Sequence, residues 1–121
     1  MINDLRRGDV IYAWAKDKID YGVIGGHRPY IIVSNDSYNK YSSSVNCVPL
    51  TSVKVGKSKE KSPSHLFLGI EQGLHRESCV LCEQICTVSK VNISSKIARL
   101  SRATMSVISD KIYYQLALNI E

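Results

Sequence analysis

The chain lacks a long hydrophobic run. Its 121 residues contain no stretch of about 18 consecutive apolar positions, which argues against a transmembrane helix. Residues 1–4 lead directly into charged positions, so the start of the sequence offers no apolar core for a secretory signal. We therefore expect a cytoplasmic protein whose thiols stay reduced.

The sequence also lacks the short motifs of the commonest enzyme classes. It has no Walker phosphate loop, no G-x-S-x-G nucleophile turn and no paired-carboxylate box. Its cysteines include one C-x-x-C pair, but no second pair and no His pair follow at the spacing of a zinc finger. We therefore expect no metal and no cofactor, and we interpret the cysteines as buried thiols in strands: Cys47, Cys79, Cys82 and Cys86.

Acidic residues are fewer than basic ones. Sixteen Lys and Arg against eleven Asp and Glu give a net charge of +5, which raises the prospect of an anionic partner, although a solvated cationic surface explains the charge slightly better when it is taken alone. The basic residues are concentrated in residues 53–62, where Gly, Ser and Pro predict a loop. We interpret this loop as a phosphate-holding arm formed by Lys54, Lys57, Lys59 and Lys61.

Short apolar and β-branched segments separated by turn-forming residues dominate the first hundred positions. The length and ordinary globular composition predict one domain over residues 1–121. Pro49 has no N–H to donate, so its strand should end at an edge or an opening of the sheet. The predicted strands span residues 10–14, 29–34, 45–50, 65–70, 78–82, 84–88 and 93–98, with a long loop over 15–27 and a helical turn within 38–44.

A C-terminal helix should close the fold. Ser101 has the character of an N-cap, and apolar residues follow it at helical spacing. Such a stripe most often packs on a core, and it also suits a dimer interface. The fold class is therefore mainly β, a small, mostly antiparallel barrel-like sheet with one helix. The stripe consists of Met105, Ile108, Ile112, Leu116 and Ile120.

Arg28 is the first candidate for catalysis. It stands at the start of a predicted strand with Pro29 fixing the backbone behind it, and its planar fork of donors suits phosphate oxygens. An RNA substrate carries its own nucleophile, the 2′-hydroxyl, so a metal-free ribonuclease needs only alignment, charge stabilisation and proton transfer. Thr51 could add a hydrogen bond to the phosphate. A surface salt bridge for Arg28 and a turn contact for Thr51 are equally simple roles.

Further polar and aromatic residues are candidates for RNA binding. Aromatic rings can stack on bases, histidines can exchange protons and amide or carboxylate groups can contact base edges. Ordinary packing or a polar turn explains each of them taken alone. The stacking candidates are Trp14, Tyr21 and Tyr41, the proton-transfer candidates are His27, His65 and His75, and the base-edge candidates are Glu83 and Gln84.

Taken together, these segments resemble the MazF/PemK family of toxin endoribonucleases, most closely its Firmicutes branch. Any one of the motifs would be weak, but their order along nearly the whole chain is specific. The matching segments are Arg7-Gly8-Asp9-Val10, Gly26-His27-Arg28-Pro29, Val33-Ser34-Asn35-Asp36, Leu50-Thr51-Ser52, Pro63-Ser64-His65, Ser78-Cys79-Val80-Leu81-Cys82-Glu83-Gln84-Ile85, Thr87-Val88 and Lys96-Ile97-Ala98.

The resemblance implies an SH3-like barrel of the kind shared with the gyrase poison CcdB, and a homodimer. It also implies metal-independent cleavage of single-stranded mRNA that leaves 2′,3′-cyclic phosphate and 5′-hydroxyl ends, within a type II toxin–antitoxin system. The family's catalytic arginine and threonine fall on Arg28 and Thr51. An RNA groove partly covered by the 15–27 loop, and an acidic MazE-like antitoxin that occupies it, follow from the same resemblance. The RNA contacts that we assign are Trp14, Tyr21, His27, Ser52, Lys54, His65, Glu83 and Gln84.

Two features depart from the family pattern. Cys86 stands where relatives often carry an arginine, which removes a positive charge, and the 53–62 loop is longer and richer in lysine. The cleavage sequence could therefore be the UACAU-like pentad of close relatives or a different sequence. A second class of function also stays open, namely a non-catalytic module of the same fold that poisons gyrase or binds RNA.

Overall fold

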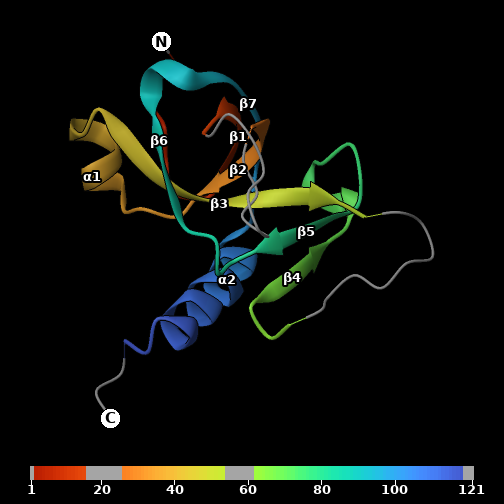
Figure 1. Ribbon diagram of the computed structural model, residues 1–121. Helices are drawn as coiled ribbons and strands as arrows, with labels where there is room; N and C mark the ends of the chain where they lie inside the picture. Colours follow the sequence, from red (N-terminus) through yellow and green to blue (C-terminus); the bar gives the residue numbers. More distant parts are fainter. Residues whose placement is uncertain (1, 16–25, 54–61, 119–121) are drawn as a thin grey trace.

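The computed structural model describes residues 2–15, 26–53 and 62–118. Within these ranges the chain forms seven strands, a short helix α1, two 3₁₀ turns and a C-terminal helix α2 (Figure 1). The strands are β1 (Asp9–Trp14), β2 (His27–Ile32), β3 (Ser44–Ser52), β4 (His65–Leu68), β5 (Ser78–Leu81), β6 (Cys86–Ser89) and β7 (Ile93–Arg99). The helices are α1 (Asp36–Tyr41) and α2 (Arg102–Gln115), and the 3₁₀ turns are η1 (Ile70–Gln72) and η2 (Lys90–Asn92). The predicted mainly β class with a C-terminal helix is confirmed.

The strands form one antiparallel sheet in the order β4-β5-β3-β2-β1-β7, with β6 as a further partner of β3. β3 is the central strand, because β6 pairs with its first half and β5 with its end. Neither of those two ladders includes Val48 or Pro49. The predicted opening at Pro49 is therefore present, although β3 lies inside the sheet and not at its edge.

Several predicted boundaries were wrong by about two residues. β2 begins at His27 and ends at Ile32, because Asn35 caps α1 by accepting a hydrogen bond from the Tyr38 N–H at 2.8 Å. α1 therefore starts earlier than the predicted turn. β6 starts at Cys86, because the Gln84 N–H donates to the Leu81 carbonyl at 3.1 Å and closes a turn at residues 81–84. Ile70, placed in the fourth strand by the sequence, begins η1 instead.

The core has two parts, one on each face of the sheet. Side chains alternate along a strand, so Val10 and Ile31 belong to one part while Ile11, Tyr30 and Ile32 belong to the other. The second half of β2, Tyr30–Ile32, is buried on both faces, as its continuous apolar sequence predicts. No helix of the described residues is long and apolar enough to cross a membrane.

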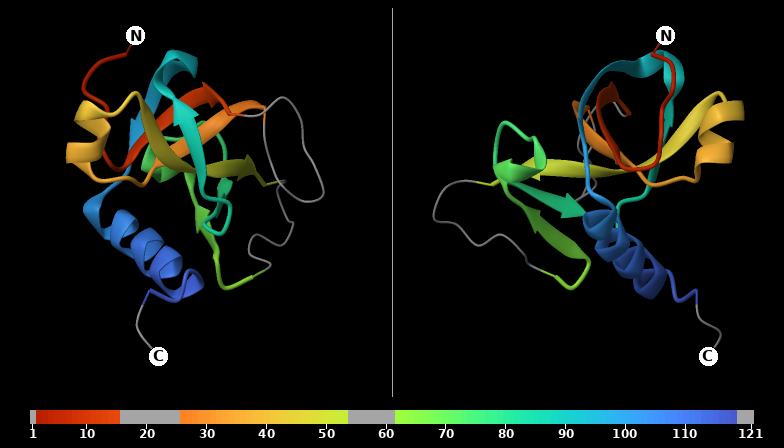
Figure 2. Two further views of the ribbon diagram at one scale, coloured as in Figure 1. Left: turned by 60° about the vertical axis from the view of Figure 1, so that its left-hand side comes forward. Right: turned by 180° about the vertical axis from the view of Figure 1, so that it is seen from behind.

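α2 closes one face of the sheet. The predicted N-cap is confirmed, since the Thr104 N–H donates to Ser101 Oγ at 3.1 Å. Met105 and Ile108 are buried in the core and Ile112 packs against it. Leu116, in contrast, is 48 % exposed, because the end of the helix runs away from the sheet (Figure 2). The last residue of the predicted stripe, Ile120, lies outside the described residues.

Candidate active site

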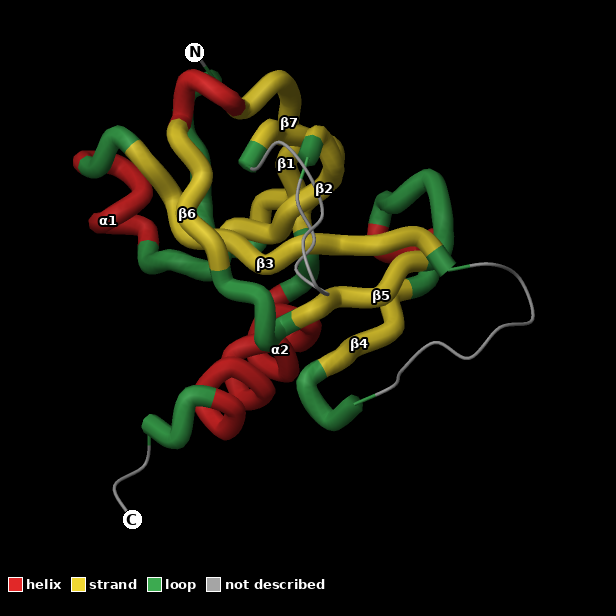
Figure 3. The backbone as a smooth tube through the Cα atoms, viewed as in Figure 1, coloured by secondary structure: helices red, strands yellow, loops and turns green. Residues whose placement is uncertain are grey.

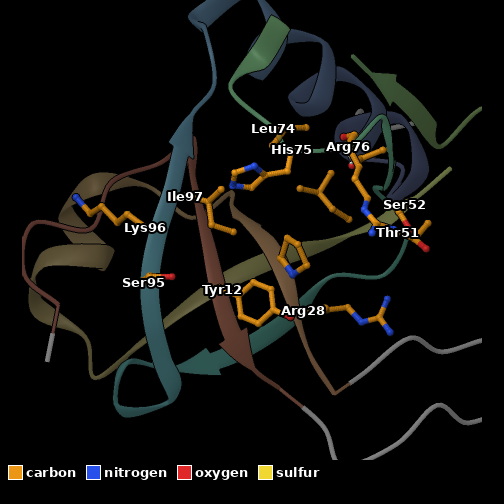
Figure 4. Close-up of a pocket in the computed structure, with 13 residues that line it drawn as sticks. Tyr12, Arg28, Thr51, Ser52, Leu74, His75, Arg76, Ser95, Lys96 and Ile97 are labelled. Atoms are coloured by element: carbon orange, nitrogen blue, oxygen red, sulfur yellow. Dashed lines mark hydrogen bonds between the residues drawn. The ribbon is translucent and has the colours of Figure 1, made fainter. Parts of the chain in front are cut away.

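A pocket of about 790 Å³ opens where β1, β2 and β7 approach the end of β3 (Figure 4). The loop between η1 and β5, residues 73–77, lies beside the end of β3 (Figure 3). It adds Leu74, His75 and Arg76 to the pocket lining. Arg28, Thr51 and Ser52 all line this pocket. The structure thus brings together the two predicted catalytic residues and one predicted RNA contact.

The strand register explains why Arg28 and Thr51 meet. β2 and β3 pair at Ile32 with Cys47, at Ile31 with Val48 and at Tyr30 with Pro49. Continued by two residues, the same register sets Arg28 opposite Thr51. The ladder stops before that point, where Pro29 would have to donate an N–H that it does not have.

On the sides that face away from each other, Arg28 and Thr51 each pair with a neighbouring strand. Arg28 pairs with Ala13 of β1, and Thr51 pairs with Cys79 of β5. Strand pairing holds the backbone of each residue. Each side chain is half-buried and lines the pocket. Arginine supplies charge and paired donors, and threonine supplies one hydroxyl, which is a suitable set for a phosphodiester.

His75 and Arg76 reach the same pocket. The sequence offered His75 as one of three proton-transfer candidates, but it did not single out Arg76. His75 is the one histidine among the residues that line the pocket in the described part of the chain. In Figure 4, His75 lies with Tyr12 and Ile97 on one side, while Arg76 runs toward Thr51 and Ser52 on the other. The pairing of β3 with β5 brings this loop to the pocket. Residue type alone therefore gave no signal for Arg76 and could not single out His75 among the three histidines.

Lys96 lines the pocket but its charge is used elsewhere. Its Nζ lies 3.3 Å from a carboxylate oxygen of Asp9 and donates to the Asp4 carbonyl at 2.5 Å. Figure 4 shows the side chain pointing away from Arg28. Among the described residues that line the pocket, the other Lys and Arg side chains are those of Arg28 and Arg76.

Trp14 and His27 face each other at the end of the β1–β2 pair, outside the pocket lining. Trp14 is 41 % exposed, which leaves part of its ring accessible. The His27 ring lies edge-on against Tyr12, with centroids 4.2 Å apart, and its Nε2 lies 3.1 Å from Ser94 Oγ. This aromatic cluster adjoins the pocket through Tyr12, which lines it.

His65 and Glu83 form a separate cluster that does not line the pocket. His65 Nε2 lies 3.0 Å from one carboxylate oxygen of Glu83, and Ser64 Oγ donates to the other at 2.9 Å. Burial opposes ionisation of Glu83, but its own backbone N–H and the His65 and Ser64 side chains outweigh burial and lower the pKa of the carboxyl. Gln84 lies in the turn that follows Glu83.

Two predicted RNA contacts, Tyr21 and Lys54, lie outside the described residues. The same holds for Lys57, Lys59 and Lys61 and for most of the 15–27 loop.

The cysteines are free thiols in or beside strands, as predicted. Cys47, Cys79 and Cys82 are buried, and Cys86 is half-buried opposite Cys47 in the β3–β6 ladder. Burial raises the pKa of Cys82 to about 12, and it raises the pKa of Cys47 as well. Across the described ranges, no group of three or more His, Cys, Asp or Glu side chains is arranged to hold a metal ion.

Comparison with known proteins agrees with this geometry. The chain is 34 % identical over 116 residues to an endoribonuclease MazF of Staphylococcus epidermidis, which covers 95 % of this chain and 93 % of the relative. Among solved structures, a mycobacterial endoribonuclease in complex with its cognate antitoxin has a TM-score of 0.75 at 24 % identity and covers 98 % of this chain and 100 % of that one. MazF from Deinococcus radiodurans has a TM-score of 0.76 at 18 % identity, covering 93 % of this chain and 96 % of that one. These two structures share its fold.

A family model matches almost the entire sequence as well. It is described as the PemK-like, MazF-like toxin of type II toxin–antitoxin systems and covers residues 6–116. The matched range includes every strand, α2 and all residues that line the pocket. The chain therefore belongs to the PemK-like, MazF-like toxin family of type II toxin–antitoxin systems.

Proposed function

We propose that this toxin is a metal-independent endoribonuclease that cuts single-stranded mRNA. The observation that carries the proposal is the meeting of Arg28 and Thr51 in one pocket, at facing positions of β2 and β3. Its relative from Staphylococcus epidermidis, an endoribonuclease MazF, extends over 95 % of the chain. The family match and the pocket thus support the same activity from independent directions.

The reaction needs four changes at the cut. The 2′-oxygen of one nucleotide forms a bond to the phosphorus, and the bond from that phosphorus to the 5′-oxygen of the next nucleotide breaks. The 2′-hydroxyl loses a proton and the 5′-oxygen gains one, which leaves a 2′,3′-cyclic phosphate and a 5′-hydroxyl. Arg28 stabilises the extra negative charge on the phosphate oxygens, and Thr51 donates a hydrogen bond to one of them. Both groups act without a metal.

The remaining proposed contacts would bind the RNA where it extends beyond the pocket. Ser52 lies beside Thr51, while Trp14 and His27 offer an aromatic surface at the end of the β1–β2 pair. Tyr21 and Lys54, which lie outside the described residues, stay proposed RNA contacts on the family resemblance. His65, Glu83 and Gln84 belong to the outer part of the RNA path, because their cluster does not line the pocket.

We also propose that the chain, as one domain over residues 1–121, works in the cytoplasm as a homodimer and is blocked by an acidic MazE-like antitoxin. Solved structures that share its fold include a mycobacterial endoribonuclease with its cognate antitoxin and MazE-MazF of Deinococcus radiodurans. A net charge of +5 suits both an RNA strand and an acidic peptide.

The test is incubation of the purified protein with a long mixed RNA in EDTA. We expect cleavage, with cyclic phosphate and 5′-hydroxyl ends at the mapped cuts. Arg28→Ala should reduce the rate by about a hundredfold to a thousandfold, the usual loss for one preorganised charge-stabilising donor. Arg102→Ala is the matched control, because it removes the same charge from an exposed position outside the pocket lining.

Three outcomes would contradict the proposal. Binding of RNA without any cutting would favour the non-catalytic alternative, and inhibition of gyrase would favour the CcdB-like one. Activity that is lost in EDTA and restored by zinc or magnesium would contradict the metal-free mechanism. Because the variants are compared at equal circular dichroism, a loss in Arg28→Ala alone assigns the effect to the pocket.

A further inference from the structure

We propose that Arg76 binds a second phosphate of the RNA strand, next to the phosphate that is cut. This inference rests on the proposed ribonuclease function and assigns a role to a loop that the family motifs above do not contain. Arg76 would act in binding and positioning, while the charge stabilisation at the reacting phosphate stays with Arg28.

The loop that carries Arg76 is fixed at both ends. Gly73 ends η1 with a φ of +90°, a conformation that favours glycine, and its N–H donates to the Ile70 carbonyl at 3.0 Å. At the other end the Val53 N–H donates to the Glu77 carbonyl at 2.9 Å, and Ser78 Oγ donates to the carbonyl of Arg76 itself at 3.0 Å. The backbone of Arg76 is therefore held beside the end of β3.

The side chain of Arg76 is exposed and available to a ligand. No side chain or carbonyl in the described part of the chain accepts a hydrogen bond from its guanidinium. No Asp or Glu is among the described residues that line the pocket, and the Lys96 charge is paired with Asp9. Within residues 2–15, 26–53 and 62–118, no lining carboxylate compensates the charge of Arg76, and an anion would complement it.

Two arginines in one pocket fit two phosphates better than one. A guanidinium fork binds a phosphate through two parallel hydrogen bonds, so Arg28 alone can serve the phosphate that is cut. The pocket volume of about 790 Å³ lies within the range of sites that enclose a whole small ligand. A single strand offers one phosphate for every nucleotide, and Arg76 reaches the pocket from a different wall (Figure 4).

The first experiment measures binding apart from cleavage. The cut site is mapped on a long RNA, and a short oligonucleotide around it is made with a 2′-deoxy sugar at the cut, which removes the nucleophile. Its affinity for the wild type, Arg76→Ala, Arg76→Lys and the control Arg102→Ala is measured over a salt series. Loss of one phosphate contact should lower the slope of log affinity against log salt by about 0.7 in Arg76→Ala only. Arg76→Lys should keep most of the slope, because it keeps the charge.

The second experiment locates the phosphate. Methylphosphonate replaces one phosphate at a time in the same oligonucleotide and removes its charge. We expect Arg76→Ala to lose no further affinity when the phosphate next to the cut is already neutral, and to lose it in full when a distant one is neutral. The inference would be overturned if Arg76→Ala and Arg102→Ala had equal salt slopes, or if the wild type did not bind the oligonucleotide. It would also be overturned if the effect of Arg76→Ala disappeared only when the cut phosphate itself was neutral.

These outcomes are separate from those of the proposed function. Cleavage of the long RNA by the wild type tests the function before the oligonucleotide is made, and the binding results on that oligonucleotide then test Arg76 separately. Normal cleavage together with unchanged binding by Arg76→Ala would remove Arg76 from the site and leave the function intact. In cleavage, Arg76→Ala should raise KM while kcat changes much less.

Discussion

Two prolines set where the sheet opens for the active site. Pro29 in β2 cannot donate a hydrogen bond toward β3, and the ladder between the two strands ends at the pair formed by Tyr30 and Pro49. Arg28 and Thr51 are the next outward-facing positions in that register. The same residue type that interrupts the ladder thus separates the strands where a phosphate has to enter.

Thr51→Ala is expected to slow turnover and leave the fold unchanged. A hydrogen bond to a charged group is worth about 1.5 to 3 kcal/mol, which corresponds to a rate loss of roughly tenfold to a hundredfold if it forms in the transition state. Thr87→Ala is a suitable control, because Thr87 is an exposed threonine in β6 outside the pocket lining. The measurement is kcat on a short RNA, and an unchanged kcat in Thr51→Ala would remove its hydroxyl from the reaction.

The sequence predicted single site residues where their chemistry is distinctive. Arg28 and Thr51 follow from residue type, from the adjacent prolines and from the family motifs, and the structure sets them in one pocket. The sequence could not single out His75 among three candidate histidines, and it gave no reason to assign Arg76, because a basic pair after a glycine turn is common on protein surfaces. Their position depends on the pairing of β3 with β5, which is a long-range contact.

Among the elements, the turn between β5 and β6 carries a hydrogen-bonded carboxylate, Glu83, whose contribution to stability should depend on pH. The pKa of Glu83 is lowered in the folded protein, so its carboxylate stabilises the fold above the ordinary carboxyl pKa of about 4.3. This contribution is lost as the pH falls through the lowered value. Glu83→Gln should therefore lower Tm at neutral pH, with a difference from the wild type that shrinks in acid.

The control for this comparison is Glu71→Gln, an exposed carboxyl in η1 for which the described residues show no ion pair. Its Tm should follow the wild type over the whole pH range. A Glu83→Gln difference that stays constant down to strongly acidic pH would show that packing, and not the charge of Glu83, is responsible.

Elements were predicted well where the apolar pattern is long, and their ends less well. β1, β5 and β7 differ from their predicted ranges by one residue. β3 continues two residues past its predicted end, and α2 begins after its predicted cap but ends at Gln115, before the end of the predicted stripe. The errors at β2 and β6 come from local hydrogen bonds at Asn35 and Gln84, which compete with the ladder. The pattern of apolar residues does not reveal hydrogen bonds of this kind.

At the scale of the whole molecule, the protein combines a basic net charge with exposed apolar residues near the end of α2. The net charge is +5, and the end of α2 and the residues after it expose Tyr114, Leu116 and Leu118. The core contacts of the helix extend from Met105 to Ile112, and its end runs away from the sheet (Figure 2). A partner that carries both acidic and apolar residues would complement these two properties at once.

We therefore expect the acidic protein encoded beside this toxin to co-purify with it and to block cleavage. Its affinity should fall with salt, because charges contribute, and it should compete with the non-cleavable RNA for the pocket at Arg28. Leu116→Ser should weaken the complex without changing RNA cleavage, because the apolar end of α2 serves the peptide and not the substrate. Val91→Ser is the matched control, since Val91 is an exposed apolar residue in η2.

If the two proteins fail to co-purify and cleavage continues in the presence of the partner, the neighbouring protein is not the antitoxin. If they bind but RNA does not compete, the partner acts away from the pocket, and the toxin is controlled through another surface.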